Sequence, residues 1–246
     1  MLGERDPRLA PDSIRARYND PKAFAAVDEW HRYTASEIRR HVNRWWNRTA
    51  NGDRGRVLNA GAGGNDLGVC PNTTINVDLS ERRLSPFSTA VVASIEAMPI
   101  ATGSIDIALC VGSVINYCDA AAAISELSRV LRPDGHLIVE FESSRSAELA
   151  LQKSFGDSVG VVKTFYCKRT EVVWAYRLDY VKHLLSATGF VVTEIIPIHV
   201  LSPWVLLVLR SKWAAALVAR LDRFGRDLPL MTRWASNFLL FCEKRS

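Results

Sequence analysis

Residues Val57–Gly68 read Val-Leu-Asn-Ala-Gly-Ala-Gly-Gly-Asn-Asp-Leu-Gly, and an acidic residue follows at Asp78 within Ile75-Asn-Val-Asp78. An apolar run that enters a glycine-rich turn predicts a strand, a turn and then a helix. Such a turn lets the backbone approach a ligand closely, and a carboxylate at the end of the next strand accepts hydrogen bonds from ribose hydroxyls. The stretch therefore predicts a nucleoside site.

Apolar strand-like runs alternate with helical segments after this turn. We expect strands at 56–60, 74–78, 90–93, 105–111, 135–142, 190–196 and 238–243. We expect helices at 13–48, divided near Pro21, and again at Ala120–Leu131 and Asp179–Thr188. This alternation is typical of βαβ units. The sequence therefore predicts an α/β fold, doubly wound around a mainly parallel seven-stranded sheet.

Composition and charge indicate the class of protein, but they do not identify a binding partner. The 246 residues are 48% apolar and 23% charged, which is typical of a globular α/β chain of one large domain. The net charge of +5 divides into +4 over residues 1–56, −4 over 57–198 and +5 over 199–246. Basic flanks suit an acidic substrate, a nucleic acid or a membrane surface, but they are equally typical of solvated helix faces.

The cysteines and the N-terminus indicate a cellular compartment. An odd number of widely spaced cysteines without a Cys-x-x-Cys pair argues against a disulfide framework or a zinc site. These cysteines are Cys70, Cys110, Cys118, Cys167 and Cys242. The first residues lack the apolar stretch of a secretory signal, and prolines interrupt the most apolar run, 195–209. We expect a soluble, cytoplasmic protein without a bound metal.

The glycine turn itself discriminates between cofactors. In the Gly-x-Gly-x-x-Gly pattern of dinucleotide folds, Asp66 takes the place of the third glycine. A carboxylate in a first helical turn complements the helix dipole, but it repels a diphosphate bound there. The turn therefore argues against NAD or FAD and tolerates a cofactor with an ammonium or sulfonium group.

Four segments in series resemble the motifs of class I S-adenosylmethionine-dependent methyltransferases of the small-molecule type. The glycine turn resembles the first motif, and Asn76–Ser80 resembles the acidic end of the second strand. The third segment, Ala93–Pro99 with Gly103–Cys110, resembles the third and fourth motifs. The fourth segment, Leu127–Val139, resembles the family's helix, turn and fifth strand. The resemblance covers about 56–142. It implies a Rossmann-like fold, S-adenosyl-L-methionine as methyl donor and S-adenosyl-L-homocysteine as product.

The resemblance also implies which residues hold the cofactor. The resemblance implies that the turn contacts the methionine portion and that Asp78 binds the ribose. It also implies that Leu79 and residues 94–95 border the adenine, and that residues 110–111 lie under the ligand. The candidates are Asn59, Ala60, Gly61, Gly63, Asp78, Leu79, Ser94, Ile95, Cys110 and Val111. Members of the family often carry an acid where this chain has Asn59 or Ser94, so a cofactor-binding protein without catalysis is an alternative.

No compact catalytic constellation stands out, which suits methyl transfer because alignment and exclusion of water supply most of its acceleration. A general base helps when the acceptor is a hydroxyl or an acidic carbon. Tyr117, Glu142 and His199 follow predicted strands and are the weak candidates, although His199 fits a packed histidine equally well. Tyr18 and Trp30 are candidates to fold over the cofactor or to belong to the core.

The resemblance and the composition together divide the chain. Residues 1–50 predict an N-terminal helical cap, and 51–246 predict the methyltransferase domain. Within it, 143–178 and a helical insertion at 199–236 are expected to cover the substrate. Residues 199–236 are rich in Trp, Leu and Arg. This composition suits three roles: a lid over an apolar pocket, a peripheral membrane contact or core packing.

The main hypothesis is a small-molecule methyltransferase with an apolar or aromatic acceptor. The basic flanks motivate an RNA methyltransferase as the alternative, which is weaker because no separate RNA-binding module is recognised. The sequence leaves open which atom is methylated and what the oligomeric state is.

Overall fold

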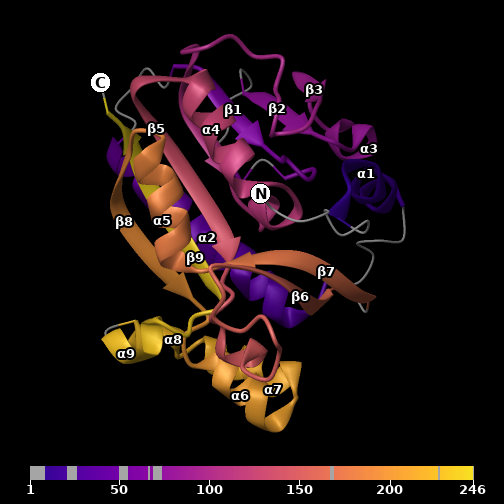
Figure 1. Ribbon diagram of the computed structural model, residues 1–246, viewed down its shortest axis with the longest axis vertical. Helices are drawn as coiled ribbons and strands as arrows, with labels where there is room; N and C mark the ends of the chain where they lie inside the picture. Colours follow the sequence, from indigo (N-terminus) through magenta and orange to yellow (C-terminus); the bar gives the residue numbers. More distant parts are fainter. Residues whose placement is uncertain are drawn as a thin grey trace.

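The computed structural model describes residues 9–20, 27–49, 55–65, 67–68, 74–166, 169–226 and 228–245. Its centre is a seven-stranded sheet with helices on both faces (Figure 1). The strands of this sheet are β1 (Val57–Ala60), β2 (Ile75–Asp78), β3 (Ala90–Val92), β4 (Ile105–Cys110), β5 (Leu131–Glu142), β8 (Phe190–Ile198) and β9 (Asn237–Lys244).

The strand order is β3-β2-β1-β4-β5-β9-β8. Neighbouring strands from β3 to β5 run parallel, whereas β9 runs antiparallel to both β5 and β8. The predicted doubly wound, mainly parallel sheet is therefore confirmed, as are its seven strands. The order reverses between β1 and β4, and a crevice forms at such a point in open α/β sheets.

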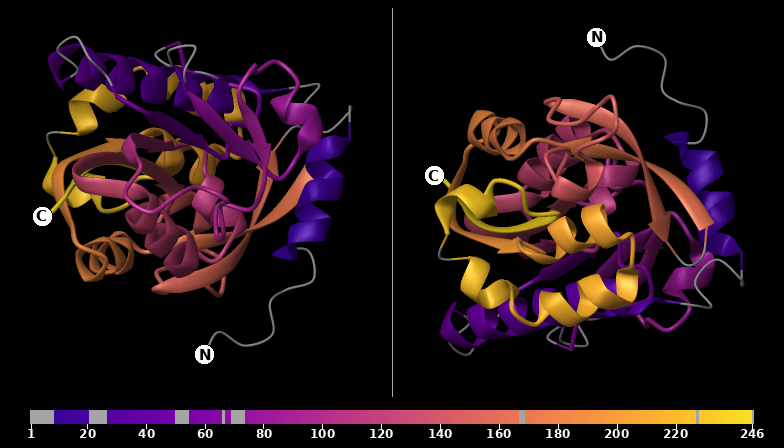
Figure 2. Two further views of the ribbon diagram at one scale, coloured as in Figure 1. Left: turned by 90° about the horizontal axis from the view of Figure 1, so that it is seen from above. Right: turned by 90° about the horizontal axis from the view of Figure 1, so that it is seen from below.

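The longest helix, α2 (Glu29–Thr49), covers one face of the sheet (Figure 2). Its buried side chains Ile38, Val42 and Trp45 recur at a spacing of three or four residues, so they share one side of the helix. They pack on strand residues that point to this face, namely Val57, Ile107, Leu109, Ile138, Leu239 and Phe241. A helix that precedes the sheet in the sequence thus forms one of its layers.

Helices α4 (Ala120–Val130) and α5 (Leu178–Ala187) cover the opposite face (Figure 2). The carboxylate of Asp119 caps α4 by accepting hydrogen bonds from the first-turn amides. Ile124 and Leu127 of α4 and Leu185 of α5 are fully buried in the core. Both predicted helices are confirmed to within one residue at each end.

The sequence predicts a helix between the glycine turn and β2. For the described residues between β1 and β2, which are 61–65, 67–68 and 74, this prediction is wrong. Positive φ angles between 55° and 82° exclude a right-handed helix there. They occur at Gly61, Gly63, Gly64, Leu67 and Gly68. Asp66, on which the argument against a diphosphate rested, lies outside the described residues.

The segment 143–178 contains a β-hairpin that the sequence did not predict. It follows the 3-10 helix η3 (Ala147–Leu149) and consists of β6 (Val159–Tyr166) and β7 (Arg169–Tyr176), which pair antiparallel as a separate two-stranded sheet. Weak alternation in 171–176 was the one signal for it. The hairpin projects beyond the carboxyl end of the main sheet in Figure 1.

The expected helical insertion before the last strand is confirmed. It comprises α6 (Ser202–Leu209), α7 (Lys212–Ala219), α8 (Asp222–Gly225) and α9 (Pro229–Thr232). Short helices also lie at α1 (Pro11–Asn19) and α3 (Glu81–Leu84), and η2 (Val114–Tyr117) is a 3-10 turn. Within the described ranges no helix is long and apolar enough to cross a bilayer. The cap boundary at residue 50 stays a prediction, because 50–54 lie outside those ranges.

Candidate active site

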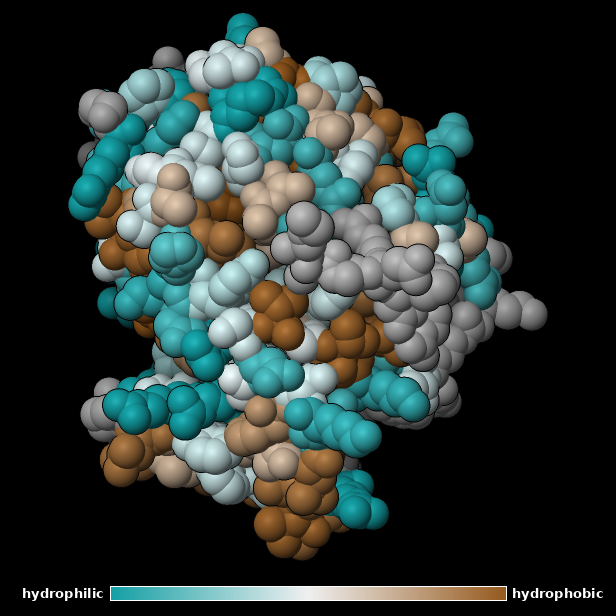
Figure 3. Space-filling view, viewed as in Figure 1, coloured by the Kyte–Doolittle hydropathy of each residue, from teal (hydrophilic) through white to brown (hydrophobic). Residues whose placement is uncertain are grey.

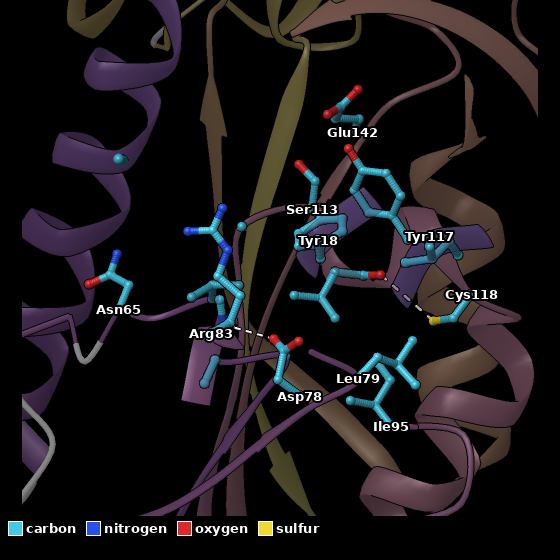
Figure 4. Close-up of a pocket in the computed structure, with 18 of the residues that line it drawn as sticks. Tyr18, Asn65, Asp78, Leu79, Arg83, Ile95, Ser113, Tyr117, Cys118 and Glu142 are labelled. Atoms are coloured by element: carbon cyan, nitrogen blue, oxygen red, sulfur yellow. Dashed lines mark hydrogen bonds between the residues drawn. The ribbon is translucent and has the colours of Figure 1, made fainter. Parts of the chain in front are cut away.

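A pocket of about 300 Å³ lies at the carboxyl ends of β1, β2, β4 and β5, next to α1 and α2 (Figure 4). This is the end of the sheet where the strand order reverses, the usual place for a ligand in this architecture. The walls come from both N-terminal helices, the glycine turn and the segments that follow the strands. The topology thus brings together residues that lie far apart in the sequence.

The glycine turn forms one wall by folding back tightly on β2. The amides of Gly61 and Ala62 both donate to the carbonyl oxygen of Val77, at 2.8 and 3.0 Å. Gly61 has a φ of +73°, and a Cβ there would collide with the side chain of Val114 in η2. Only glycine fits this position, so bare backbone borders the pocket.

Asp78 ends β2 and is the acidic residue next to this turn (Figure 4). Its carboxylate accepts from the amides of Gly63 and Ser80, each at 2.8 Å. Burial raises the pKa of Asp78, and the two amides and the nearby Arg83 offset part of that rise. A carboxylate can accept about four hydrogen bonds, so Asp78 can also accept from hydroxyl donors in the pocket.

Seven of the ten predicted cofactor residues line the pocket: Gly61, Gly63, Asp78, Leu79, Ser94, Ile95 and Val111. The other three, Asn59, Ala60 and Cys110, are buried in β1 and β4 and are not among the residues that line it.

Asn59 has a structural position beneath the turn. Its Nδ2 donates to the carbonyl oxygen of Asn65 at 2.9 Å and to Oδ1 of Asn76 at 3.0 Å. Asn59 therefore ties the glycine turn to β2. Cys110 faces the core, where burial raises the pKa of its thiol to about 12.

A buried carboxylate that the sequence did not single out holds the loop after β4. Glu140 accepts from the amides of Gly112 and Ser113, at 2.9 and 2.6 Å, and from Nδ2 of Asn237 at 2.7 Å. Ser113 has a φ of +60°, in the left-handed region. Two hydrogen bonds to Glu140 thus hold the loop that borders the pocket, and the third ties Glu140 to β9.

Tyr117 and Glu142 lie at the end of the pocket away from Asp78, and Tyr18 lies between Asp78 and Glu142 (Figure 4). The rings of Tyr18 and Tyr117 meet edge to face, with centroids 5.7 Å apart. Burial raises the pKa of Tyr18 to about 12 and that of Tyr117 well above its usual value, and the charge of Glu142 adds to both shifts. Both phenols therefore stay protonated at neutral pH and cannot serve as proton acceptors.

Asn116 fixes the backbone of Glu142 at this end. Its Oδ1 accepts from the Glu142 amide at 2.9 Å, and its Nδ2 donates to the Glu142 carbonyl at 3.1 Å. The same Nδ2 donates to the carbonyl of Trp174 at 2.6 Å, which links the main sheet to the hairpin. Asp78 and Glu142 are the two carboxylates among the residues lining the pocket.

The structure adds a histidine that the sequence reasoning missed. His31, near the start of α2, lines the pocket, and its Nδ1 lies 2.6 Å from Oδ1 of Asp28. The same carboxylate oxygen accepts from the His31 amide at 3.1 Å. Since an ionised carboxylate can only accept, the proton of this contact lies on Nδ1. The Asp28-x-x-His31 spacing at a helix start was the available signal.

His199, a weak catalytic candidate, does not lie among the residues that line the pocket. It is fully buried and stacks on Trp30, with ring centroids 3.6 Å apart and planes within 3°. Its Nε2 lies 2.8 Å from Oγ1 of Thr34, and its Nδ1 lies 2.9 Å from Oγ of Ser202. His199 and Trp30 thus join α2 to α6 as core residues.

We expect the buried His199 to make the protein less stable in acid. Burial lowers the pKa of His199 to about 3 from 6.5, so protonation favours the unfolded chain. Its contribution is full above pH 6.5 and falls as the pH drops towards 3, at up to about 1.4 kcal/mol per pH unit. Urea denaturation at pH 7.5 and 5.5 measures this fall. His199→Gln should show a smaller fall, and equal falls in both proteins would contradict the assignment.

Further lining residues were missed because their positions depend on tertiary packing. Ile14, Thr34, Ala35 and Ile38 come from the N-terminal helices, Arg83 from α3 and Thr164 from the hairpin. Tyr18, by contrast, was a candidate to fold over the cofactor, and it does line the pocket. Within the described part of the chain, no group of three or more His, Cys, Asp or Glu residues could hold a metal ion.

The comparisons with known proteins indicate a methyltransferase. Residues 58–139 match the family model described as a methyltransferase domain. A curated relative, the ubiquinone/menaquinone biosynthesis C-methyltransferase UbiE of Geotalea uraniireducens (strain Rf4), is 27% identical over 157 residues. That match covers 54% of this chain and 62% of the relative, so the chain spans less than two thirds of its length.

Solved structures share the fold at low identity. A putative S-adenosylmethionine-dependent methyltransferase from Listeria monocytogenes superposes with a TM-score of 0.57 at 13% identity, covering 83% of this chain and all of the other. Geranyl diphosphate C-methyltransferase from Streptomyces coelicolor A3(2) also gives 0.57, at 14% identity, covering 97% and 98% of the two chains. The latter structure contains S-adenosyl-L-homocysteine, and these likenesses concern the fold.

Proposed function

We propose that this chain, which belongs to the class I S-adenosylmethionine-dependent methyltransferases of the small-molecule type, moves a methyl group from that cofactor to a small molecule. The observation that carries the proposal is the buried carboxylate of Asp78 beside a turn where a side chain at Gly61 would collide. A carboxylate that accepts hydrogen bonds from hydroxyls, next to backbone without a side chain, suits a nucleoside that carries an amino-acid portion.

The residues present fit S-adenosylmethionine. The carboxylate of Asp78 suits the ribose hydroxyls as an acceptor, and the apolar Leu79 and Ile95 suit the adenine. The backbone of Gly61 and Gly63 borders the place for the methionine portion. When bound, the cofactor supplies an electrophilic methyl group, so the chain itself has to align the acceptor and exclude water.

We assign the acceptor to the end of the pocket formed by Tyr18, Tyr117 and Glu142. Apolar and aromatic side chains dominate there and extend to Ile14 and Ile38, which favours an apolar or aromatic acceptor. The names of the relative and of the Streptomyces structure, for quinone biosynthesis and geranyl diphosphate, support an acceptor of this kind.

The proton acceptor in this proposal is His31. Asp28 fixes the imidazole in the tautomer that leaves Nε2 basic, and imidazole is the side chain best matched to proton transfer near neutral pH. The reaction then forms a bond from the acceptor atom to the methyl carbon and breaks the carbon–sulfur bond. The proton of the acceptor, where it has one, moves to Nε2 of His31.

The proposal is tested first by ligand-induced stabilisation. S-adenosylmethionine and S-adenosyl-L-homocysteine should each raise the melting temperature, whereas NAD should not. Incubation with labelled S-adenosylmethionine and a cell extract should then transfer label to a small molecule identified by mass. Binding without transfer to any fraction would favour the non-catalytic alternative, and label in RNA would favour a nucleic-acid substrate.

A further inference from the structure

The apolar-basic surface is the outward side of α6 to α9, residues 202–233. Of the twelve large hydrophobic residues exposed in the described part of the chain, eight lie here. They are Val208, Leu209, Trp213, Leu217, Leu221, Phe224, Leu228 and Leu230. Figure 3 shows brown side chains gathered along the lower edge of the molecule, over these helices. Such a concentration exceeds the scattered apolar residues of an ordinary surface.

Contacts on the inner side of these helices anchor them to the rest of the protein. Ala215 and Ala219 of α7 are fully buried. The buried carboxylate of Asp222 accepts from the amides of Leu201 and Ser202, at 2.7 and 3.1 Å. Arg226 donates to Oε2 of Glu37 in α2 at 2.6 Å. The outward apolar side chains, such as Trp213 at 73% exposed, are thus presented by an anchored scaffold.

The exposed charged residues that the structure describes on this surface have one sign. Arg210, Arg220 and Arg233 are exposed among the apolar side chains. Across 200–226 and 228–233, the described acidic residue is Asp222, which is buried and bonded to the backbone. The sequence places Asp227 here as well, outside the described residues. The exposed surface therefore combines apolar side chains with positive charge.

We propose that the apolar-basic surface docks on the headgroup region of an anionic phospholipid bilayer. Tryptophan and leucine side chains enter such an interface by about 5–10 Å, while arginines on the same surface pair with lipid phosphates. A second copy of the chain is the less suitable occupant, because facing two such surfaces would bring like charges together. This docking is independent of the methyl transfer proposed above.

The surface and the pocket lie at the same end of the sheet. Strand β5 ends at Glu142, which lines the pocket, and the chain then forms η3, which packs on α6. In Figure 1, α6 and α7 lie beyond the carboxyl ends of the strands, below the hairpin. A bilayer on this surface would therefore lie on the acceptor side of the molecule.

The test uses the full chain and vesicles of defined composition. In sedimentation, the chain should bind vesicles that contain about one quarter phosphatidylglycerol at least ~10-fold more tightly than pure phosphatidylcholine. High salt should weaken the binding. The double variant Trp213→Ser with Leu217→Ser, and the triple variant with Arg210, Arg220 and Arg233 changed to Glu, should each bind at least ~10-fold more weakly.

Matched control variants distinguish binding through this surface from non-specific binding to vesicles. Val92→Ser changes an exposed apolar residue of β3, and Lys182→Glu reverses an exposed charge of α5, so both should bind as the unchanged chain does. Circular dichroism melting confirms that each variant is folded. Failure to bind anionic vesicles, or equal binding by the surface variants, overturns the proposal. Self-association that the double variant abolishes, without vesicle binding, assigns the surface to a second copy instead.

Discussion

Asp78→Ala is expected to weaken S-adenosylmethionine binding about 100-fold while leaving the fold intact. Hydrogen bonds to a charged acceptor contribute about 1.5–3 kcal/mol each, and 1.4 kcal/mol corresponds to about tenfold in affinity. The substitution removes the acceptor for two ribose hydroxyls, and it also releases the Gly63 amide that the carboxylate holds. Isothermal titration calorimetry measures the change in Kd.

Asp78→Asn is the matched variant for this experiment. It keeps the shape of the side chain and one oxygen, but it loses the charge, so we expect an intermediate loss of affinity. Arg82→Ala changes an exposed residue of α3 near the site and should bind normally. Unchanged affinity of Asp78→Ala would remove Asp78 from the site.

His31→Asn is expected to lower kcat about 100-fold for an acceptor that must lose a proton, while the Kd for S-adenosylmethionine stays unchanged. General base catalysis contributes about 10²–10⁴-fold, and the substitution removes the basic nitrogen that Asp28 orients. Steady-state kinetics with the identified acceptor measures kcat, and isothermal titration calorimetry measures the Kd for S-adenosylmethionine.

Two other pocket residues serve as comparisons for His31. Glu142→Gln and Tyr117→Phe keep the shape of the acceptor end, and we expect each to lower kcat less than tenfold. A loss of about 100-fold in Glu142→Gln, with normal activity of His31→Asn, would move the proton acceptor to Glu142. An acceptor amine that enters the site neutral should be insensitive to His31→Asn.

The sequence predicted the central fold because local patterns and topology agree there. The apolar runs of β1, β4 and β5 are buried on both faces, so they read as continuous strands that must lie in the middle of a sheet. The glycine turn and Asp78 follow β1 and β2 directly, which fixed their place at the carboxyl end of the sheet.

Where tertiary packing decides, the sequence could not place the side chains. Asn59 and Cys110 belong to strands beside the pocket, but they are buried and are not among the residues that line it. His199 looked like a base because it follows a strand, yet its contacts come from Trp30 and Thr34, more than 150 residues earlier in the chain. His31 was missed for the same reason, since only folding brings the start of α2 to the pocket.

The place of β9 within the sheet has a consequence for synthesis on the ribosome. In the described structure β9 lies between β5 and β8, and β8 pairs with the rest of the sheet through β9 alone. Until residues 237–244 have emerged, β5 and β8 each present an open edge to other chains. A nascent chain stalled within α6 to α9 should therefore be prone to aggregate. Once β9 has emerged, it pairs with both β5 and β8 and covers these two edges.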